Sequence, residues 1–305
     1  MRTLLIAGMG DVARRALPRL VQHWRVLVLA HHQAAARLAR AGGAIPVMAD
    51  LDDAASLARL AGLADALWIT APPPPSGQRD SRTRKLLYAL AKADRIPQRI
   101  SYISTTGVYG SSAGNWLDEC SPPLPQTDRA RRRLDAEHTL RAFARRHGCQ
   151  LSILRAPGIY ALERLPLTRL LQSTPLIRPA EDSFSNHIHA DDLASLCIAS
   201  LQQHRGGIRV FNACDQEPLT ITDWYAMLAD ALSLPLPPQL SRAEVQAAVS
   251  PALWSYMAES RRFRHQRLAE LGVALRYPTA REFVAQLAAN PAWQAVALAK
   301  AGKIR

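Results

Sequence analysis

The sequence predicts an α/β protein built on a doubly wound parallel β-sheet, with a smaller, mostly helical C-terminal lobe. Strand-like and helix-like segments alternate through the first 160 of the 305 residues, as they do in successive βαβ units. The strand-like segments are nearly continuous apolar runs, which is typical of a sheet covered by helices on both faces. A glycine-containing turn, Gly8-Met9-Gly10-Asp11-Val12-Ala13, joins the first strand directly to the first helix.

The elements of this first part follow one another closely. The predicted strands are residues 3–7, 25–30, 45–48, 66–70 and 99–104, and the predicted helices are residues 12–24, 33–41, 54–60 and 81–93. The first helix contains Pro18, which would kink it or leave a backbone carbonyl unpaired. The fourth strand ends at the prolines 72–75, which cannot donate to a sheet ladder and therefore form a loop.

The alternation weakens beyond residue 160. A helix is predicted over 191–201, a strand over 209–212 and a loop over the Pro/Leu-rich residues 232–240, and the remainder is mostly helical. We therefore expect a Rossmann-type domain in residues 1–160 and a substrate-binding lobe in residues 161–305. Parts of residues 184–214 are expected to return to the sheet of the first domain.

The glycine turn is a predicted dinucleotide site. Gly8 permits a tight turn, Gly10 lets the backbone approach a pyrophosphate, and the small Ala13 lets helix and strand pack closely. Asp11 and Val12 begin the helix, whose unpaired N–H groups and dipole favour an anion. A plain tight turn is the other interpretation, and the strand–turn–helix context favours the cofactor.

The stretch after the turn bears on the choice between NAD and NADP. An NAD-specific site usually has an acidic residue about 20 residues past the glycines, but none occurs between Asp11 and Asp50. His31, His32 and Arg37 lie there instead and favour a 2′-phosphate, hence NADP, with NAD as the alternative. The competing interpretation is that the two histidines only begin a solvated helix.

The end of the third strand offers a further cofactor contact. Asp50 and Leu51 follow this strand, where a carboxylate and a backbone amide could meet the adenine. A helix N-cap at this position is the competing interpretation, and the two are compatible.

Composition narrows the class of protein. The net charge of +13 comes from arginines spread along the chain, so it favours a solvated basic surface over a nucleic-acid partner. The four cysteines have no metal-binding spacing and suit a reducing compartment, so we expect no metal site.

The apolar runs are too short for a membrane span or for the h-region of a signal peptide. We therefore expect a cytoplasmic protein with no membrane partner. The sequence leaves the oligomeric state open, a homodimer included.

A second motif carries a family resemblance. The stretch Ser104-Thr105-Thr106-Gly107-Val108-Tyr109-Gly110 resembles the Ser/Thr-x-x-Val-Tyr-Gly signature of the extended short-chain dehydrogenase/reductases, or NAD-dependent epimerase/dehydratases. Further stretches match in the family's order, at residues 155–160, 186–193, 210–212 and 277–279. The resemblance covers about residues 1–285 and implies an NAD(P)-binding oxidoreductase or epimerase.

The resemblance also implies roles for particular residues. Thr105 matches the catalytic Ser/Thr that hydrogen-bonds the reacting substrate oxygen, although its hydroxyl could instead bond local backbone. The other matched segments are Thr70, Ala71 and Pro72 beside the cofactor ribose, and Ala156, Pro157 and Gly158 beside the nicotinamide. The Asn-x-x-His-x-x-Asp segment from Asn186 to Asp192 is expected to close the C-terminal lobe onto the sheet.

The chain departs from the family at its Tyr-x-x-x-Lys pair, where Arg129 and Arg133 stand instead. Arginine keeps its proton at any working pH, so Arg129 cannot be the acid/base, whereas Arg133 could still hold the nicotinamide ribose. Tyr109 is then the nearest substitute phenol and Tyr160 the next. Two functions follow, an NADP-dependent oxidoreductase or epimerase-like enzyme with an unidentified small substrate, or a non-catalytic NADP-binding sensor or scaffold.

Overall fold

A seven-stranded parallel sheet forms the centre of the protein. The computed structural model describes residues 1–203 and 206–302. From one edge to the other, the strands are β12 (Ile208–Asn212), β7 (Gln150–Ala156), β5 (Arg99–Thr105), β4 (Ala66–Ile69), β1 (Thr3–Ala7), β2 (Arg25–Ala30) and β3 (Ile45–Met48). Each neighbouring pair runs parallel, so all seven carboxyl ends lie along one edge of the sheet.

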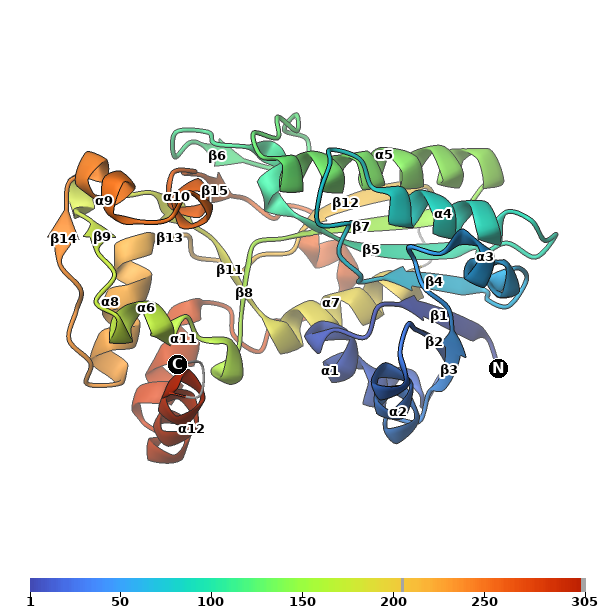
Figure 1. Ribbon diagram of the computed structural model, residues 1–305, viewed down its shortest axis with the longest axis horizontal. Helices are drawn as coiled ribbons and strands as arrows, with labels where there is room; N and C mark the ends of the chain where they lie inside the picture. The colour runs from blue at the N-terminus through green and yellow to red at the C-terminus, as the bar shows by residue number, and fades with distance from the viewer. Residues whose placement is uncertain (204–205, 303–305) are drawn as a thin grey trace.

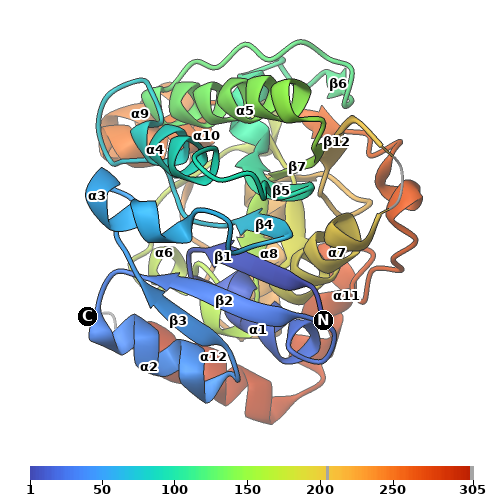
Figure 2. The ribbon, with the colours of Figure 1, turned by 90° about the vertical axis from the view of Figure 1, so that its right-hand side faces the viewer.

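Helices cover both faces of this sheet (Figures 1 and 2). One face carries α1 (Asp11–Leu20), α2 (Gln33–Ala41) and α7 (Ala190–Gln202). The other carries α3 (Ala54–Leu57), the 3-10 turn η1 (Ala58–Leu60), α4 (Ser81–Leu90) and α5 (Asp128–His147). This double cover explains the continuous apolar strands, because side chains on both faces of the sheet are buried.

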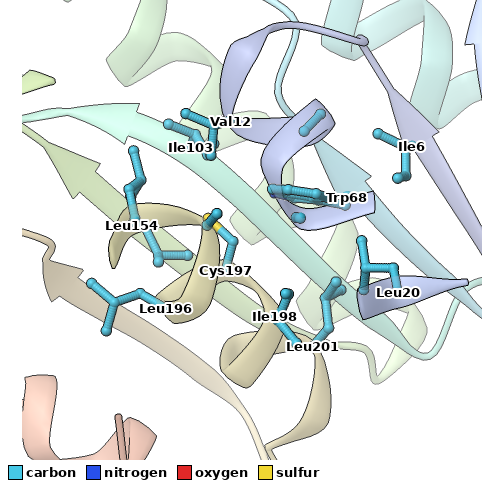
Figure 3. Packing of buried hydrophobic residues seen from close by; sticks show 14 of the residues in the cluster. Ile6, Val12, Leu20, Trp68, Ile103, Leu154, Leu196, Cys197, Ile198 and Leu201 are labelled. Atoms are coloured by element: carbon cyan, nitrogen blue, oxygen red, sulfur yellow. The ribbon is translucent and has the colours of Figure 1, made fainter. Parts of the chain in front are cut away.

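The core under α1 and α7 joins segments that lie far apart in the chain. Trp68 of β4 is fully buried in the same cluster as Leu20 of α1 and Leu201 of α7 (Figure 3). Cys197 lies in the same cluster beside Leu154 of β7. The described cysteines are all free thiols, and this one packs as a small apolar residue.

Most of the remaining elements gather beyond the carboxyl ends of the strands (Figure 1). The helices there are α6 (Leu167–Leu171), α8 (Ile221–Ala231), α9 (Arg242–Ala248), α10 (Pro251–Met257), α11 (Ala280–Ala288) and α12 (Pro291–Gly302). The 3-10 turns there are η2 (Thr106–Tyr109), η3 (Leu162–Arg164) and η4 (Pro179–Glu181), whereas η5 (Leu268–Leu271) packs against α7 in the core beside the sheet. Within the described residues, none of the helices has the length and apolar character that crossing a membrane requires.

Short strand pairs tie these elements together. They are β8 (Gly158–Tyr160) with β11 (His187–His189), β9 (Leu176–Ile177) with β14 (Gln239–Leu240), β10 (Phe184–Ser185) with β13 (Leu219–Thr220), and β6 (Trp116–Leu117) with β15 (Arg262–Phe263). A second apolar core forms here around Trp224, Tyr277 and Phe283. We call the elements around this second core the C-terminal lobe.

The predicted elements are present, with shifted ends. The first helix ends at Leu20, not at residue 24, because His23 N–H bonds the Leu20 carbonyl three residues back (3.1 Å) and breaks the α-helical pattern before β2 begins. The predicted loop at 232–240 contains the two-residue strand β14. Predicted helix 54–60 is split into a short α-helix and a 3-10 turn.

Two large elements were not predicted, β7 and the 20-residue helix α5. Charged residues fill half of the 20 positions of α5, so its apolar stripe is narrow. The stripe consists of small or widely spaced side chains, Ala136, Leu140, Phe143 and Ala144, all buried.

Candidate cofactor and substrate site

The sheet order brings the predicted cofactor residues together along one edge. Pro157 follows β7, Thr105 ends β5, and Ala71 lies just after β4. Gly8 follows β1, His31 follows β2, and Asp50 lies just after β3. In an open α/β sheet, the crevice outside the carboxyl ends of the strands is where ligands bind. Segments separated by up to about 150 residues in the chain therefore face one crevice.

The two glycines of the turn differ in what surrounds them. Gly8 has a φ of +110°, and a Cβ there would lie 2.6 Å from the backbone nitrogen of Ala71. The Thr70 hydroxyl donates to the Gly8 carbonyl (2.8 Å), which fixes the β4 loop against the turn. At Gly10, by contrast, a Cβ would meet no described atom within 4 Å. Gly8 is thus required by the fold, whereas Gly10 leaves space in front of the helix.

The N-terminus of α1 fits a pyrophosphate. Gly10 is its N-cap and supplies no side-chain hydrogen bond, whereas α2, α3, α4 and α5 each begin with a side-chain cap. Val12 and Ala13 are buried against the sheet, so the helix start is held close to β1. An uncapped helix start with open space before it is an anion-binding arrangement.

Arginines neutralise Asp11 in the first turn of α1. Its carboxylate accepts from Arg15 Nε (3.1 Å) and from Arg164 Nη1 (3.2 Å). Burial raises the pKa of Asp11, but these hydrogen bonds and the two positive charges outweigh it and lower the pKa. Arg15 also pairs with Asp191 and Glu163. The Asp11 charge is therefore compensated and does not by itself exclude an anion.

Of the predicted cofactor residues after β2, one is used by the fold and two are exposed. His32 is the N-cap of α2, and its Nδ1 accepts from the Ala35 N–H (3.0 Å). His31 and Arg37 are exposed at the same end of the sheet. One of the two histidines therefore begins the helix, as the competing interpretation had it, while His31 and Arg37 stay accessible to a ligand.

The segments after β3 and β4 are held by local bonds. Asp50 N–H donates to the Ser56 hydroxyl (2.9 Å), Leu51 is buried, and Asp53 caps α3. Ala71 N–H donates to the Ala7 carbonyl (2.9 Å), and the Pro72 carbonyl accepts from Arg82 (3.2 Å). The N-cap predicted near Asp50 thus falls on Asp53, and the Asp50 carboxylate remains at the strand end.

A cavity of about 230 Å³ lies between the carboxyl ends of β5 and β7 and the C-terminal lobe. On the sheet side, its wall includes Thr105, Pro157 and Gly158. On the lobe side, the wall includes β10, part of α10 and residues 259–261. A Cβ at Gly158 would come within 3.3 Å of the Asn186 carbonyl, so the two sides approach closely there.

The segment from Asn186 to Asp192 joins the lobe to the sheet. The Asn186 side chain accepts from Phe263 N–H (3.1 Å) and donates to the Arg261 carbonyl (2.9 Å). The Asp192 carboxylate accepts from the backbone N–H groups of Arg276 (2.7 Å) and Tyr277 (3.0 Å). These bonds connect distant backbone segments across the junction, in line with the closing role predicted for this segment.

Thr105 lies at the cavity wall, where its hydroxyl oxygen accepts from Gly107 N–H (3.2 Å). The local turn bond and the exposure to the cavity are thus both present. Because the oxygen accepts in this bond, the hydroxyl proton remains free for a ligand.

The two predicted substitute phenols lie outside the cavity. Tyr109 is 3% exposed, and its hydroxyl donates to Asn212 Oδ1 (2.8 Å). Burial raises the pKa of Tyr109 to about 12, although nearby Arg155 acts in the opposite direction. Tyr160 is buried in the core of the lobe, and burial raises its pKa further still. Neither phenol touches the cavity, because local packing turns both rings into apolar clusters.

Arg129 and Arg133, which stand in place of the family's Tyr-x-x-x-Lys pair, have different surroundings. Arg129 lines the cavity from the first turn of α5. Arg133 donates through Nη1 to the Ile103 carbonyl (2.8 Å) and the Tyr102 hydroxyl (3.2 Å). Arg133 therefore anchors α5 to β5 through Nη1, and its other guanidinium nitrogens bond no described residue.

Tyr256 of α10 is a phenol in the cavity wall that sequence reasoning missed. Its hydroxyl lies 3.2 Å from the Ser185 hydroxyl, which in turn lies 3.4 Å from Nε2 of the buried His187. Tyr256 lies far from every matched motif in the chain, so the sequence offered no signal for it.

A buried ion pair was also missed. Glu137 of α5 accepts from Arg155 Nε (3.0 Å) and Nη2 (2.7 Å) of β7, and from the Ser104 hydroxyl (2.6 Å) of β5. Burial opposes the charge of Arg155, but the bonds and charge of Glu137 outweigh it and raise the pKa of Arg155. The two residues lie 18 positions apart in the chain, and the sequence offered no signal that they pair.

The comparisons with known proteins agree with this geometry. Residues 8–204 match the model of the NAD(P)H-binding family. A functionally unknown conserved protein from Silicibacter pomeroyi DSS is 30% identical, with a TM-score of 0.78 over 95% of this chain and 99% of that one. An NAD-dependent epimerase/dehydratase-like protein from Methylobacillus flagellatus is 26% identical, with a TM-score of 0.71 over 94% of this chain and 98% of that one.

Other similar structures share the fold at lower identity. UDP-glucose 4-epimerase from Thermotoga maritima, solved with UDP-glucose, is 15% identical, with a TM-score of 0.74 over 94% of this chain and 97% of that one. No match was found among the curated proteins. The family match and the structural relatives together place the chain in the NAD(P)H-binding family, among the extended short-chain dehydrogenase/reductases that resemble NAD-dependent epimerase/dehydratases.

Proposed function

We propose that the protein binds NADP across the carboxyl ends of β1, β2, β4, β5 and β7 and acts on a small substrate in the adjoining cavity. The strand order carries this proposal. It places the predicted cofactor segments side by side along one edge of the sheet, from Pro157 after β7 to Asp50 after β3. The uncapped start of α1 would hold the pyrophosphate, and Gly10 provides the space that the pyrophosphate needs.

In this proposal, the two parts of the chain divide the work. Residues 1–160 with β12 bind the cofactor, and the lobe within residues 161–305 encloses the substrate. When bound, the cofactor accepts or supplies a hydride at the substrate end of the crevice. The chain's own residues orient the reactants, with Arg133 toward the nicotinamide ribose and the Thr105 hydroxyl toward a substrate oxygen.

Proton transfer needs a group that replaces the missing tyrosine. We propose Tyr256, because it is the described phenol that lines the cavity and its hydroxyl is next to that of Ser185. A proton given up by the phenol could be replaced from solvent through the neighbouring Ser185 hydroxyl. This assignment replaces the earlier candidates Tyr109 and Tyr160, whose hydroxyls are buried outside the cavity.

A non-catalytic NADP-binding sensor or scaffold is the second candidate. The observation that favours it is Arg129, which places a permanent cation where the family has its acid/base. The two candidates share the cofactor site and differ in whether the cavity carries out a reaction. Turnover, not binding, therefore separates them.

The cofactor assignment is tested by titrating the protein with NADPH and NADH and following the nicotinamide fluorescence. We expect NADPH to bind more tightly, because Arg37 and His31 are exposed where a 2′-phosphate would lie. A hydrogen bond to a charged group contributes about 1.5–3 kcal/mol, so Arg37→Gln should weaken NADPH by about tenfold or more. NADH affinity should change little.

Arg40→Gln is the matched control, since Arg40 is an exposed arginine in the last turn of the same helix. It should leave both affinities nearly unchanged. If the unaltered protein binds NADH as tightly as NADPH or more tightly, the proposed NADP preference is wrong. If it binds neither NADPH nor NADH, the proposed cofactor site is wrong.

A further inference from the structure

Arg129 differs from the three arginines that follow it on α5 in having no partner within the part of the chain that the structure describes. Arg131 pairs with Asp128 (2.8 Å), while Arg132 and Arg133 donate to backbone carbonyls. The Arg129 guanidinium, which is exposed at the cavity wall, makes no hydrogen bond or ion pair with a residue that the structure describes.

The acid nearest to Arg129 in the cavity wall is already paired. Glu259 binds Arg261, with Oε2 2.5 Å from Nη2, so its charge is compensated locally. Partial burial lowers the pKa of Arg129, and the positive charge of Arg133 lowers it further, while the negative charge of Glu259 only partly opposes them. The cavity therefore contains a cation whose charge its surroundings do not balance.

Hydroxyl groups around this cation are arranged as donors. The Thr105 oxygen accepts from Gly107 N–H (3.2 Å), and the Thr127 oxygen accepts from Ala130 N–H (3.2 Å). Each threonine thus uses its oxygen as an acceptor in a backbone bond, and neither donates its proton to a described residue. Both residues line the cavity with Arg129, so two O–H donors accompany one guanidinium fork.

We propose that the cavity takes a substrate that carries a carboxylate or phosphate, and that Arg129 binds this anionic group with help from the hydroxyls of Thr105 and Thr127. The guanidinium offers parallel N–H donors that match the two oxygens of either group. The exchange of the family's tyrosine for Arg129 then replaces a proton donor with an anchor for an anion. The inference rests on the proposed function, because it assumes that the cavity is the substrate site.

The test uses two small probes, malonate and inorganic phosphate, titrated by calorimetry into protein saturated with NADPH. Saturation occupies the phosphate-binding turn at α1, so that the probes report on the cavity. We expect one of the probes to bind with a 1:1 stoichiometry, and the preferred one distinguishes a carboxylate from a phosphate. Arg129→Gln should weaken it by about tenfold or more, and Arg129→Lys should restore part of the affinity as a single point charge.

Arg131→Gln is the matched control, because it removes a charge two residues away on the same helix but outside the cavity wall. It should leave probe affinity within about twofold, and thermal unfolding should show that all the variants are folded. The inference is overturned if Arg129→Gln binds the probe as tightly as the unaltered protein does. It is also overturned if neither probe binds the unaltered protein at the highest concentration used, at matched ionic strength. If NADPH itself fails to bind, the proposed function fails, and the probe titrations on cofactor-free protein still compare Arg129→Gln with Arg131→Gln.

Discussion

Glu137 shows how a single side chain positions the cavity. Its carboxylate joins α5 to β7 through Arg155 and to β5 through Ser104, next to Thr105. The Arg155 guanidinium also lies 4.6 Å from the centre of the Tyr109 ring, which keeps that ring in the core. Removing either member of a buried ion pair leaves the other charge uncompensated, so this pair specifies the arrangement of three elements at once.

A residue-scale prediction concerns the proton donor. We expect the NADPH-bound protein to reduce a panel of aldehydes and ketones slowly or not at all, because the family's acid is replaced by Arg129. For any substrate that does react, Tyr256→Phe should lower kcat by about 10²–10⁴-fold, the range of general acid–base assistance. Turnover is measured by NADPH absorbance.

Tyr88→Phe serves as the control, because Tyr88 of α4 is a phenol with 68% exposure that does not line the cavity. It should keep full activity. A Tyr256→Phe protein with unchanged kcat on a rapidly converted substrate would disprove the assignment of the proton donor.

At the scale of elements, the β1–α1 turn combines a steric requirement with a free space. Gly8 is held by its contact with the β4 loop, while Gly10 sits in front of an uncapped helix. Gly8 is therefore required by the path of the backbone, whereas Gly10 leaves the space in which we propose that the pyrophosphate binds. The sequence motif alone does not distinguish them.

Substitutions at the two glycines should separate stability from binding. Gly10→Val should abolish NADPH binding and leave the melting temperature nearly unchanged, because the new side chain enters only the pyrophosphate's space. Gly8→Ala should lower stability by about 1–3 kcal/mol or more, because its φ of +110° strains any L-residue and its Cβ meets the Ala71 backbone. Calorimetry and circular dichroism measure the two effects, and unchanged NADPH affinity in Gly10→Val would remove the basis of the cofactor site.

On the scale of the whole molecule, neutral titratable groups fill the junction of sheet and lobe. His187 and His189 of β11 are buried, and burial lowers the pKa of each to about 4. Asp215 lies beside them at 3% exposure, and burial raises its pKa to about 8, with Glu217 and Asp192 adding to the shift. The folded protein therefore keeps both histidines unprotonated and Asp215 protonated near neutral pH.

This junction predicts a pH dependence of stability. Below about pH 6.5, the two histidines bind protons in the unfolded chain but not in the folded protein. The free energy of unfolding therefore falls as the pH drops toward 4. Above that pH, the unfolded chain has released the Asp215 proton that the folded chain retains up to about pH 8, so stability falls as the pH rises. We expect maximum stability near pH 6.5 in urea unfolding.

Asp215→Asn should flatten the decline between about pH 6.5 and 8, because an amide does not titrate. Asp223→Asn is the control, since Asp223 is an exposed carboxylate at the start of α8. The prediction fails if the alkaline decline has the same slope in Asp215→Asn as in the unaltered protein.

Much of the sheet and the phosphate turn could be predicted because local chemistry specifies them. Apolar runs predicted β1, β2 and β3, and the strand–Gly–helix pattern predicted the turn at Gly8 and Gly10. The absence of an acid after β2 likewise pointed to His31 and Arg37, which are exposed there. These features depend on residues within a few positions of one another, so periodicity and steric limits are sufficient to find them.

Only the tertiary structure decided what lines the cavity. It turned Tyr109 into the core and brought Tyr256 of the lobe to the strand ends. It also left Arg129 without a partner among the described residues while pairing Glu137 with Arg155. Each of these outcomes depends on which distant segments pack together, and a side chain's burial and charge balance are set by those neighbours. The sequence by itself therefore determined the cofactor edge of the sheet, whereas the chemistry of the cavity arose from the packing of the lobe against it.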